Sequence, residues 1–387
     1  MLSVKLKNAA LRDNNNLDLV RLILASMVIY GHSFAVNPSV GMGTDLFFEV
    51  TGYHSGDLAI KGFFLISGIL VTGSILSHKS VFSYVSSRFF RIWPALFIVV
   101  LITALVIGPM VTNMTLEQYF SDRGLTNYIW KTITLQNWGG QSVGDYDLPG
   151  VFHGNAYPKI VNAPLWSITA EVFAYILILF LFLGRALQKP AALVIFTLIA
   201  VDSLLPEKFL FYWLPQSLRD FSALLFCFAF GSIMTIYKKN IVISASVFVS
   251  LFALNYLIGG KNTEPLMAYM MLFVVIILFA CNRFVRSVRI PYDISYGVFL
   301  YGWPIQQIIA LYLPDWPHLA SLLLSFLLAF IAGFFSCVLV ERPSQKFGRW
   351  MKGQLLLHSA KVIPARQSSI NTLNGDRGSS TSNSSVS

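Results

Sequence analysis

Charged residues are scarce in this sequence of 387 residues, where Asp, Glu, Lys and Arg together make up 12%. Apolar residues make up 55%, which is more than the core of a soluble protein of this length requires. The composition therefore predicts an all-α integral membrane protein. The formal net charge of +10 is then a property of the segments between spans, and it does not indicate nucleic-acid binding.

Cysteine is also rare. Cys227, Cys281 and Cys337 each lie in an apolar run, without the spacing of a disulfide pair or a metal site, so we expect buried, unreactive thiols and no bound metal. A cleavable signal peptide is not evident, because the sequence is polar up to Asp18 and the first apolar run is long enough to act as a signal anchor. No internal repeat is visible.

Ten apolar runs have about the length of a membrane-spanning helix. They cover residues 17–36, 60–77, 92–110, 165–183, 191–205, 221–236, 241–258, 266–281, 294–313 and 319–340. Lys and Arg are concentrated in the N-terminal segment, in every second loop and in the C-terminal segment, while acidic residues prevail in the other loops. The positive-inside rule then predicts about ten transmembrane helices with both termini in the cytoplasm.

These spans divide the chain into three parts: a cytoplasmic N-terminal segment (1–16), a transmembrane domain (17–347) and a cytoplasmic tail (348–387). From about residue 359 the tail is rich in Ser, Asn and Thr, and we expect it to be disordered. A long outer loop covers residues 111–164. Its aromatic side chains could stack on sugar rings or anchor the protein at the membrane interface: Trp130, Trp138, Tyr146 and Tyr157.

The first apolar run contains an arginine and a histidine, Arg21 and His32. Such side chains are costly inside a span and are therefore candidates for function. Their separation of eleven residues is close to three helical turns, so both would project from nearly the same face, roughly 16 Å apart along the axis. Alternatively, Arg21 extends to the cytoplasmic interface and His32 is an interfacial residue.

At the cytoplasmic end of the third run, Arg88 and Arg91 are three residues apart and would share one side of a helix. Two guanidinium groups placed in this way form a fork for phosphate oxygens. The alternative is ordinary positive-inside charge beside lipid phosphates. In the second run, small residues are expected to allow close helix packing or to leave room for a narrow acyl or pantetheine chain: Ser67, Gly68, Thr72, Gly73 and Ser74.

A carboxylate, Glu171, lies about one turn into the fourth run from its outer end. Inside a span it requires a partner, and the candidates are Arg21, His32 or a bound polar substrate, unless it is neutral and structural. In the ninth run, Gln306 and Gln307 require interior partners for the same reason.

Six short motifs, in this order, resemble those of the acyltransferase-3 family of ten-helix membrane O-acyltransferases, and the resemblance covers residues 14–347. The motifs are Arg-x10-His at Arg21 and His32, FFLISG at Phe63–Gly68, Arg-x-x-Arg at Arg88 and Arg91, PLWSITAE ending at Glu171, SYGVFLYGWPI at Ser295–Ile305, and the Glu-x-Pro turn at Glu341.

This resemblance implies an O-acetyltransferase of the bacterial inner membrane. It would transfer an acyl group from cytoplasmic acyl-CoA (acetyl-CoA) to a hydroxyl group of a surface polysaccharide or its lipid-linked precursor. His32 would act as general base or as acyl carrier. Arg21 would bind the donor or neutralise developing charge, Glu171 would orient His32 or the acceptor, and Arg88 and Arg91 would bind the phosphates of the donor.

Two other classes of membrane protein also have many spans. A transporter or flippase of glycan precursors commonly has inverted repeats with matching polar positions in both halves. Here Arg21, His32 and Glu171 all lie in the first half, which favours an enzyme. A polymerase of lipid-linked glycans would also have a long outer loop, but it would not require a cytoplasmic phosphate fork.

Overall fold

The computed structural model describes residues 3–9, 11–37, 45–78, 80–136, 147–205, 209, 221–258 and 264–354. Most of this part of the chain is helical. The longer helices are α2 (Leu17–Val36), α4 (Ser55–His78), α5 (Val81–Ile102), α8 (Arg123–Ile133), α9 (Trp166–Leu183), α10 (Lys189–Leu204), α12 (Ser222–Ile236), α13 (Ala245–Ile258), α14 (Glu264–Ala280), α16 (Ser295–Tyr312) and α17 (His318–Ser336).

Short elements connect these helices. They are α1 (Leu6–Ala9), α3 (Leu46–Thr51), α6 (Gly108–Val111), α7 (Leu116–Ser121), α15 (Arg283–Ser287), and strands β1 (Ser3–Lys5) and β2 (Val242–Ser244), which pair antiparallel. A π-helical turn joins α5 to α6, and another continues α17 into a helical extension that reaches residue 354. We call residues 342–354 the C-terminal extension.

Each of the ten predicted apolar runs contains a helix in the structure. Five stretches are long and apolar enough to cross a membrane: Leu17–Val36, Ser55–Ser77, Val81–Val111, Ala163–Leu183 and His318–Gln354. Together with the apolar composition, they support a multi-pass membrane protein. The full number of ten spans stays a prediction, because three further apolar helices have only 10–17 residues: Ser222–Ile236, Ala245–Leu257 and Pro265–Ala280.

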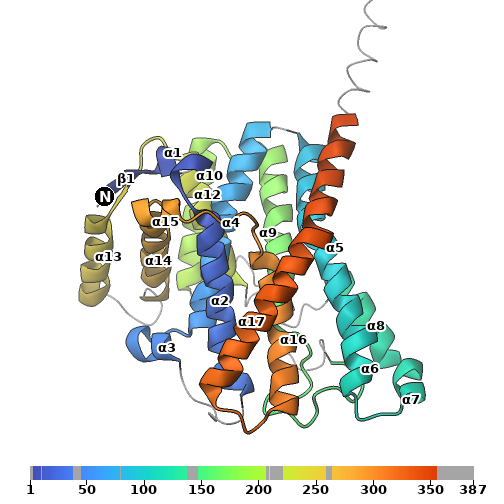
Figure 1. Cartoon of the computed structure of the whole chain (residues 1–387). Coiled ribbons are helices and arrows are strands. Elements are labelled where there is room, and N and C mark those ends of the chain that lie inside the picture. Colours follow the sequence, from blue (N-terminus) through green and yellow to red (C-terminus); the bar gives the residue numbers. More distant parts are fainter. Residues whose placement is uncertain are drawn as a thin grey trace, which may run out of the picture.

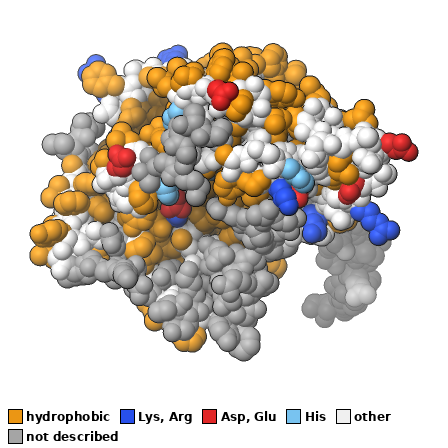
Figure 2. Space-filling model, turned by 90° about the horizontal axis from the view of Figure 1, so that it is seen from below, with side chains coloured by type: hydrophobic (Ala, Val, Ile, Leu, Met, Phe, Trp, Pro, Cys, Tyr) orange, Lys and Arg blue, Asp and Glu red, His pale blue; other side chains and the backbone are white. Residues whose placement is uncertain are grey.

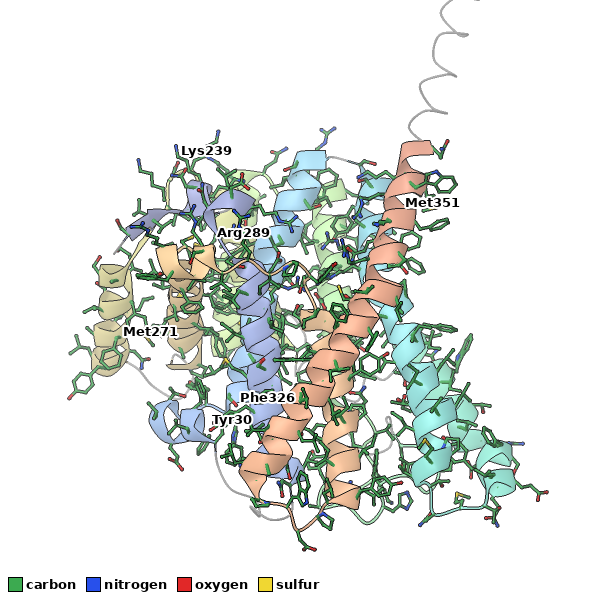
Figure 3. All side chains as sticks on the ribbon, in the orientation of Figure 1. Tyr30, Lys239, Met271, Arg289, Phe326 and Met351 are labelled. Carbon is green, nitrogen blue, oxygen red and sulfur yellow. The ribbon has the colours of Figure 1, made fainter. Side chains whose placement is uncertain are left out.

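The long helices run along one common direction (Figure 1). We call the end that carries α1 and the C-terminal extension the upper end, and the end that carries α3 and α7 the lower end. Lys239 and Arg289 lie at the upper end (Figure 3), whereas the lower end shows many apolar and few basic side chains (Figure 2). The N-terminal segment and the C-terminal extension share the upper end, and its cytoplasmic location stays a prediction.

Helix α4 passes through the centre of the bundle, with 72% of its most apolar window buried. It packs closely on α12, because a Cβ atom on Gly68 would lie 2.2 Å from the carbonyl oxygen of Phe228. The hydroxyl of Thr72 donates to that of Ser232 over 2.8 Å at the same interface. Gly68 and Thr72 therefore serve close helix packing, which is one of the two roles expected for the small residues of α4.

The predicted outer loop contains two helices as well as extended chain. Helix α7 begins with a reciprocal capping box between Thr115 and Gln118, and α8 begins at the N-cap Asp122. Helix α8 packs on the lower end of α5 and on the π-helical turn that follows it, where the Tyr128 hydroxyl lies 3.0 Å from that of Thr103. Trp138 and Tyr146 lie outside the described residues, as does the tail from residue 355.

Residues 147–162 fold into the protein beside α16. Gln307 Nε2 donates to the carbonyl oxygen of Tyr157 over 2.8 Å, and Trp303 Nε1 donates to that of Ile160 over 3.0 Å. Asn162 Nδ2 donates to the carbonyl oxygen of Leu300 over 2.9 Å. Helix α9, which follows this segment, lies in the upper half of the bundle (Figure 1).

Candidate active site

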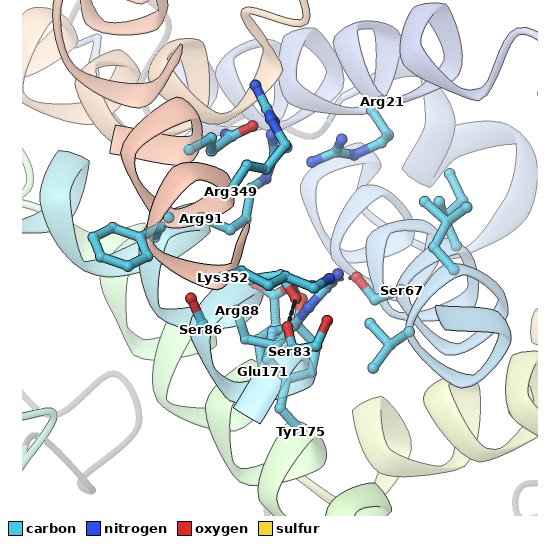
Figure 4. Close-up of a pocket in the computed structure, with 17 residues that line it drawn as sticks. Arg21, Ser67, Ser83, Ser86, Arg88, Arg91, Glu171, Tyr175, Arg349 and Lys352 are labelled. Atoms are coloured by element: carbon cyan, nitrogen blue, oxygen red, sulfur yellow. Dashed lines mark hydrogen bonds between the residues drawn. The ribbon is translucent and has the colours of Figure 1, made fainter. Parts of the chain in front are cut away.

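A cavity of about 300 Å³ opens at the upper end of the bundle (Figure 4). Its walls come from α2, α4, α5, α9 and the C-terminal extension. Five basic side chains and one carboxylate line it: Arg21, Arg88, Arg91, Arg349, Lys352 and Glu171. The cavity therefore has a strongly positive lining and is suited to an anionic ligand.

Asp293, in the segment before α16, joins two of these arginines. Its Oδ2 atom lies 2.5 Å from Arg21 Nη1 and 3.0 Å from Arg91 Nη2. Its Oδ1 atom accepts from the hydroxyl of Ser295 over 2.5 Å. Burial alone would raise the pKa of Asp293, but the two guanidinium groups and Ser295 hold it well below its usual range. Asp293 thus stays ionised and fixes both arginines.

Arg88 and Arg91 line the same cavity, as their spacing predicted, but their surroundings differ. Arg91 is held by Asp293, and its guanidinium carbon lies 5.9 Å from the ring centroid of Tyr296. The guanidinium carbon of Arg88 lies 5.6 Å from the ring centroid of Tyr175. Its Nε atom is buried and has no hydrogen-bond partner among the described residues. The charge of Arg91 is therefore balanced by a carboxylate, whereas Arg88 has no such ion pair among the described residues.

Glu171 lies on α9 at the inner wall of this cavity. Its Oε1 atom accepts hydrogen bonds from Ser67, over 3.2 Å, and from the hydroxyl of Tyr175. Arg21 lines the same cavity, so two of the charged side chains of the predicted site meet there. The hydrogen bonds of Glu171 join it to α4 and to its own helix, whereas an orienting contact with His32 stays a prediction.

A narrower cavity of about 50 Å³ continues from the first one into the bundle. The two share Arg21, Ser67 and Glu171. Further in, the walls are mostly apolar, and the rings of Phe63 and Phe299 lie 6.0 Å apart, edge to face. We call this narrower cavity the apolar passage.

His32 lies about one helical turn beyond the apolar passage. Along α16, Trp303 follows Phe299 by four residues, and its ring centroid is 4.8 Å from that of His32. Along α4, Gly56 precedes Ile60 by four residues, and a Cβ atom built there would lie 3.9 Å from His32 Nε2. His32 Nδ1 is buried without a hydrogen-bond partner among the described residues. Arg21 therefore lines both cavities, and His32 lies deeper in the bundle, beyond the inner end of the apolar passage.

Residues 14–342 match the model of the acyltransferase-3 family, which is described as an acyltransferase domain. This match covers most of the chain. The chain belongs to that family. The match confirms the family that the six motifs predicted.

Two curated proteins are similar to this chain. An O-acetyl transferase of Shigella phage Sf6 is 27% identical over 346 residues, which cover 85% of this chain and 95% of that protein. Nodulation protein 10 of Rhizobium leguminosarum bv. viciae is 31% identical over 191 residues, which cover 47% of this chain and 48% of that protein. No solved structure matches the chain.

The protein is therefore an acyltransferase, and the family and the phage relative together support the prediction of an O-acetyltransferase. This result decides between the enzyme and the transporter in favour of the enzyme. In this acyltransferase, the family motifs around Phe63–Gly68 and Ser295–Ile305 supply walls of the apolar passage. The motif residue Glu341 is buried nearby and accepts a hydrogen bond from Ser336 over 3.1 Å.

Three charged residues of the site were not singled out from the sequence. Asp293 is an isolated acid in a loop whose other charges are basic, and this contrast is the signal that could have found it. Arg349 and Lys352 were attributed to the positive charge of the cytoplasmic tail. Only the helical continuation of α17 brings them to the cavity.

Proposed function

We propose that this acyltransferase transfers an acetyl-type acyl group from cytoplasmic acyl-CoA to a hydroxyl group of a surface polysaccharide or its lipid-linked precursor. The observation that carries the proposal is the basic cavity at the upper end, which continues through the apolar passage toward His32. The proposed location is the inner membrane of a bacterium, with the upper end in the cytoplasm.

The basic cavity suits the nucleotide part of acyl-CoA. Arg88 and Arg91 would bind the diphosphate, because guanidinium groups make strong, directional hydrogen bonds to phosphate oxygens. The apolar passage suits the thin pantetheine arm, which carries the thioester. This arrangement would place the acyl carbon near His32 while the charged part of the donor stays at the membrane surface.

The reaction requires a base for the acceptor hydroxyl. His32 would take the proton as the hydroxyl oxygen attacks the thioester carbon, and the thiolate would leave when the tetrahedral intermediate collapses. The proton would then pass from the imidazole to the thiolate, which restores neutral His32 and releases free CoA. Transfer through an acyl-histidine is the alternative route.

The surroundings of Arg21 and Glu171 support roles for both residues on the donor side of this reaction. Arg21 shares Asp293 with Arg91, which supports a role in donor binding more than direct charge neutralisation at the acyl carbon. Glu171 lies with Ser67 where the two cavities meet. It would position the donor arm at that point, and any effect on His32 would act through the bound substrate.

The acceptor would approach from the lower end, where a polar cavity of about 400 Å³ lies between α8 and residues 147–153. Sugar hydroxyls form hydrogen bonds with groups of the kind that line it, including Asp122, Asn127 and Asp147. Burial raises the pKa of Asp147, although His153 and Lys159 oppose this. Residues 147–162 connect this cavity to Trp303 and so to His32.

The proposal is tested by following the acyl group. Purified protein in lipid vesicles receives acetyl-CoA with a labelled acetyl group together with surface glycan from cells that lack the gene. We expect label in the glycan as an alkali-labile ester, and mass spectrometry should find an acetyl group on the glycan only in cells that carry the gene. Release of CoA without any acylated glycan would contradict the proposed acceptor class.

A further inference from the structure

The C-terminal extension forms one wall of the basic cavity. Four of its residues line this wall, Gln345, Gly348, Arg349 and Lys352, and their spacing places them on one face of a helix. The match to the family model ends at residue 342, so this wall lies outside the matched domain. Two of the five cations of the cavity, Arg349 and Lys352, therefore come from a segment that the family match does not cover.

The extension is anchored to α5 beside the cavity. A Cβ atom on Gly348 would lie 2.5 Å from the ring of Phe90, so the helix backbone and this ring are in close contact. The rings of Phe90 and Phe347 lie 5.7 Å apart, edge to face. This packing fixes the helix so that the side chains of Arg349 and Lys352 extend into the same space as those of Arg88 and Arg91 (Figure 4).

The cations are arranged by depth. The side chain of Arg91 is 22% exposed and is paired with Asp293, and Arg88 Nε is buried, whereas Arg349 is exposed and Lys352 is half-buried. Arg349 and Lys352 thus lie at the mouth. A cavity of about 300 Å³ is at the small end of the range for ligand sites, so a coenzyme A ester with its arm in the apolar passage must leave its adenosine end at this mouth.

We infer that Arg349 and Lys352 bind the 3′-phosphate of the adenosine of the donor, so that the extension makes this acyltransferase selective for CoA thioesters over dephosphorylated analogues. The inference rests on the proposed acyl-CoA donor. A phosphate monoester carries about −1.5 to −2 charges at pH 7, more than each phosphate of a diphosphate bridge, and it requires cations of its own. In the proposed donor complex Arg88 and Arg91 bind the diphosphate, and Arg21 is paired with Asp293, which leaves the two mouth cations for this group.

The test compares the binding of CoA with that of 3′-dephospho-CoA by full-length protein in lipid nanodiscs. We expect wild type to bind CoA at least about ten-fold more tightly, because hydrogen bonds between charged groups are stronger than those between neutral groups. The double variant Arg349→Gln/Lys352→Gln should bind CoA about as weakly as dephospho-CoA and should bind dephospho-CoA as wild type does. Lys346→Gln is the matched control, because Lys346 lies on the same helix, is exposed and does not line the cavity.

The other outcomes separate the inference from the proposed function. Equal binding of the two ligands by wild type would overturn the 3′-phosphate site while leaving the CoA donor in place. Equal weakening of both ligands in the double variant would also overturn it, because the two cations would then act on the diphosphate or through general positive potential. If wild type bound neither ligand, the acyl-CoA donor itself would be wrong.

Discussion

Arg21 on α2 and Asp293 before α16 form an ion pair of 2.5 Å, in which each side chain is 18% exposed. The same carboxylate oxygen holds Arg91 of α5 at 3.0 Å. One acidic group thus connects three segments that are far apart in the chain, directly beside the basic cavity. Such a bridge fixes the position of two cations while reducing their repulsion.

Asp293→Asn should destabilise the protein and weaken donor binding, because both guanidinium groups lose their shared partner. Each lost charge-assisted hydrogen bond should cost about 1.5–3 kcal/mol. In the Asp293→Asn background, Arg21→Gln should lower the free energy of unfolding by less than it does in wild type, because the ion pair is already broken. Thermal unfolding in detergent of the two single variants and the double variant measures this coupling, and additive effects would contradict the bridge.

Arg88 and Arg91 have different surroundings, so replacing each of them should have different consequences. Arg88→Gln should raise the KM for acyl-CoA with little change in thermal stability, because Arg88 rests on Tyr175 and has no ion pair among the described residues. Arg91→Gln should raise KM and also lower the unfolding temperature, since Asp293 loses a partner. Arg88→Lys should restore donor binding only in part, because an ammonium group does not reproduce the fork.

Donor kinetics and unfolding temperature are measured on the same preparations, with Lys346→Gln as the control for loss of one cytoplasmic charge. An unchanged KM for acyl-CoA in both Arg88→Gln and Arg91→Gln would contradict phosphate binding by these residues. They would then be ordinary positive-inside charges.

The packing of α4 on α12 predicts that alanine substitutions at two glycines of α4 change the stability of the protein very differently. A Cβ atom on Gly68 would lie 2.2 Å from the backbone oxygen of Phe228, whereas one on Gly73 would only touch a methyl group of Thr235 at 3.9 Å. Gly68→Ala should therefore destabilise by about 1–3 kcal/mol through overpacking. Gly73→Ala should be neutral or stabilising, because alanine favours a helix. Equal unfolding temperatures for the two variants would contradict this interface.

The helices could be predicted because a membrane span must be long and apolar, and every predicted run contains a helix. The depth of α9 could not be predicted in this way. The position of residues 147–162 could not be predicted either, because they are held inside by hydrogen bonds that Trp303 and Gln307 of α16 donate. Such contacts join a side chain to a backbone carbonyl group about 150 residues away, and nothing in the local sequence of either segment indicates them.

For the site, unusual charge within apolar sequence was the informative signal. It found Arg21, Arg88, Arg91 and Glu171, which line one cavity. The same rule could not find Arg349, because a basic residue just beyond the last span is expected whether or not it binds a ligand. Its contribution depends on the direction of the helical extension, which only the three-dimensional structure gives.

The predicted orientation can be tested with two exposed serines at opposite ends, Ser121 on α7 and Ser287 on α15. The three native cysteines are buried, so an introduced thiol should react selectively. An impermeant thiol reagent should label Ser121→Cys in intact cells, and it should label Ser287→Cys only after the membrane is opened. Labelling of Ser287→Cys alone in intact cells would place the basic cavity on the outer side of the membrane. This result would contradict the proposal that the enzyme uses cytoplasmic acyl-CoA.

His32 is predicted to be the catalytic base, and His32→Ala should abolish acyl transfer while acyl-CoA binding stays near that of wild type. General base catalysis contributes about 10²–10⁴ in rate, so the loss should appear in kcat. Binding should persist because the cations of the basic cavity lie near the upper end of the bundle, and the apolar passage lies between them and His32. Arg21→Ala should differ, with part of its defect in donor binding, because Arg21 lines that cavity.

Trp303→Phe provides the matched control for packing around His32. It keeps an aromatic ring beside the imidazole but removes the hydrogen bond to Ile160. It should therefore lower stability more than His32→Ala does, and it should retain measurable transfer. If a folded, inserted His32→Ala protein acylated its acceptor at the wild-type rate, His32 could not be the base, and the proton of the acceptor hydroxyl would have to pass to another group.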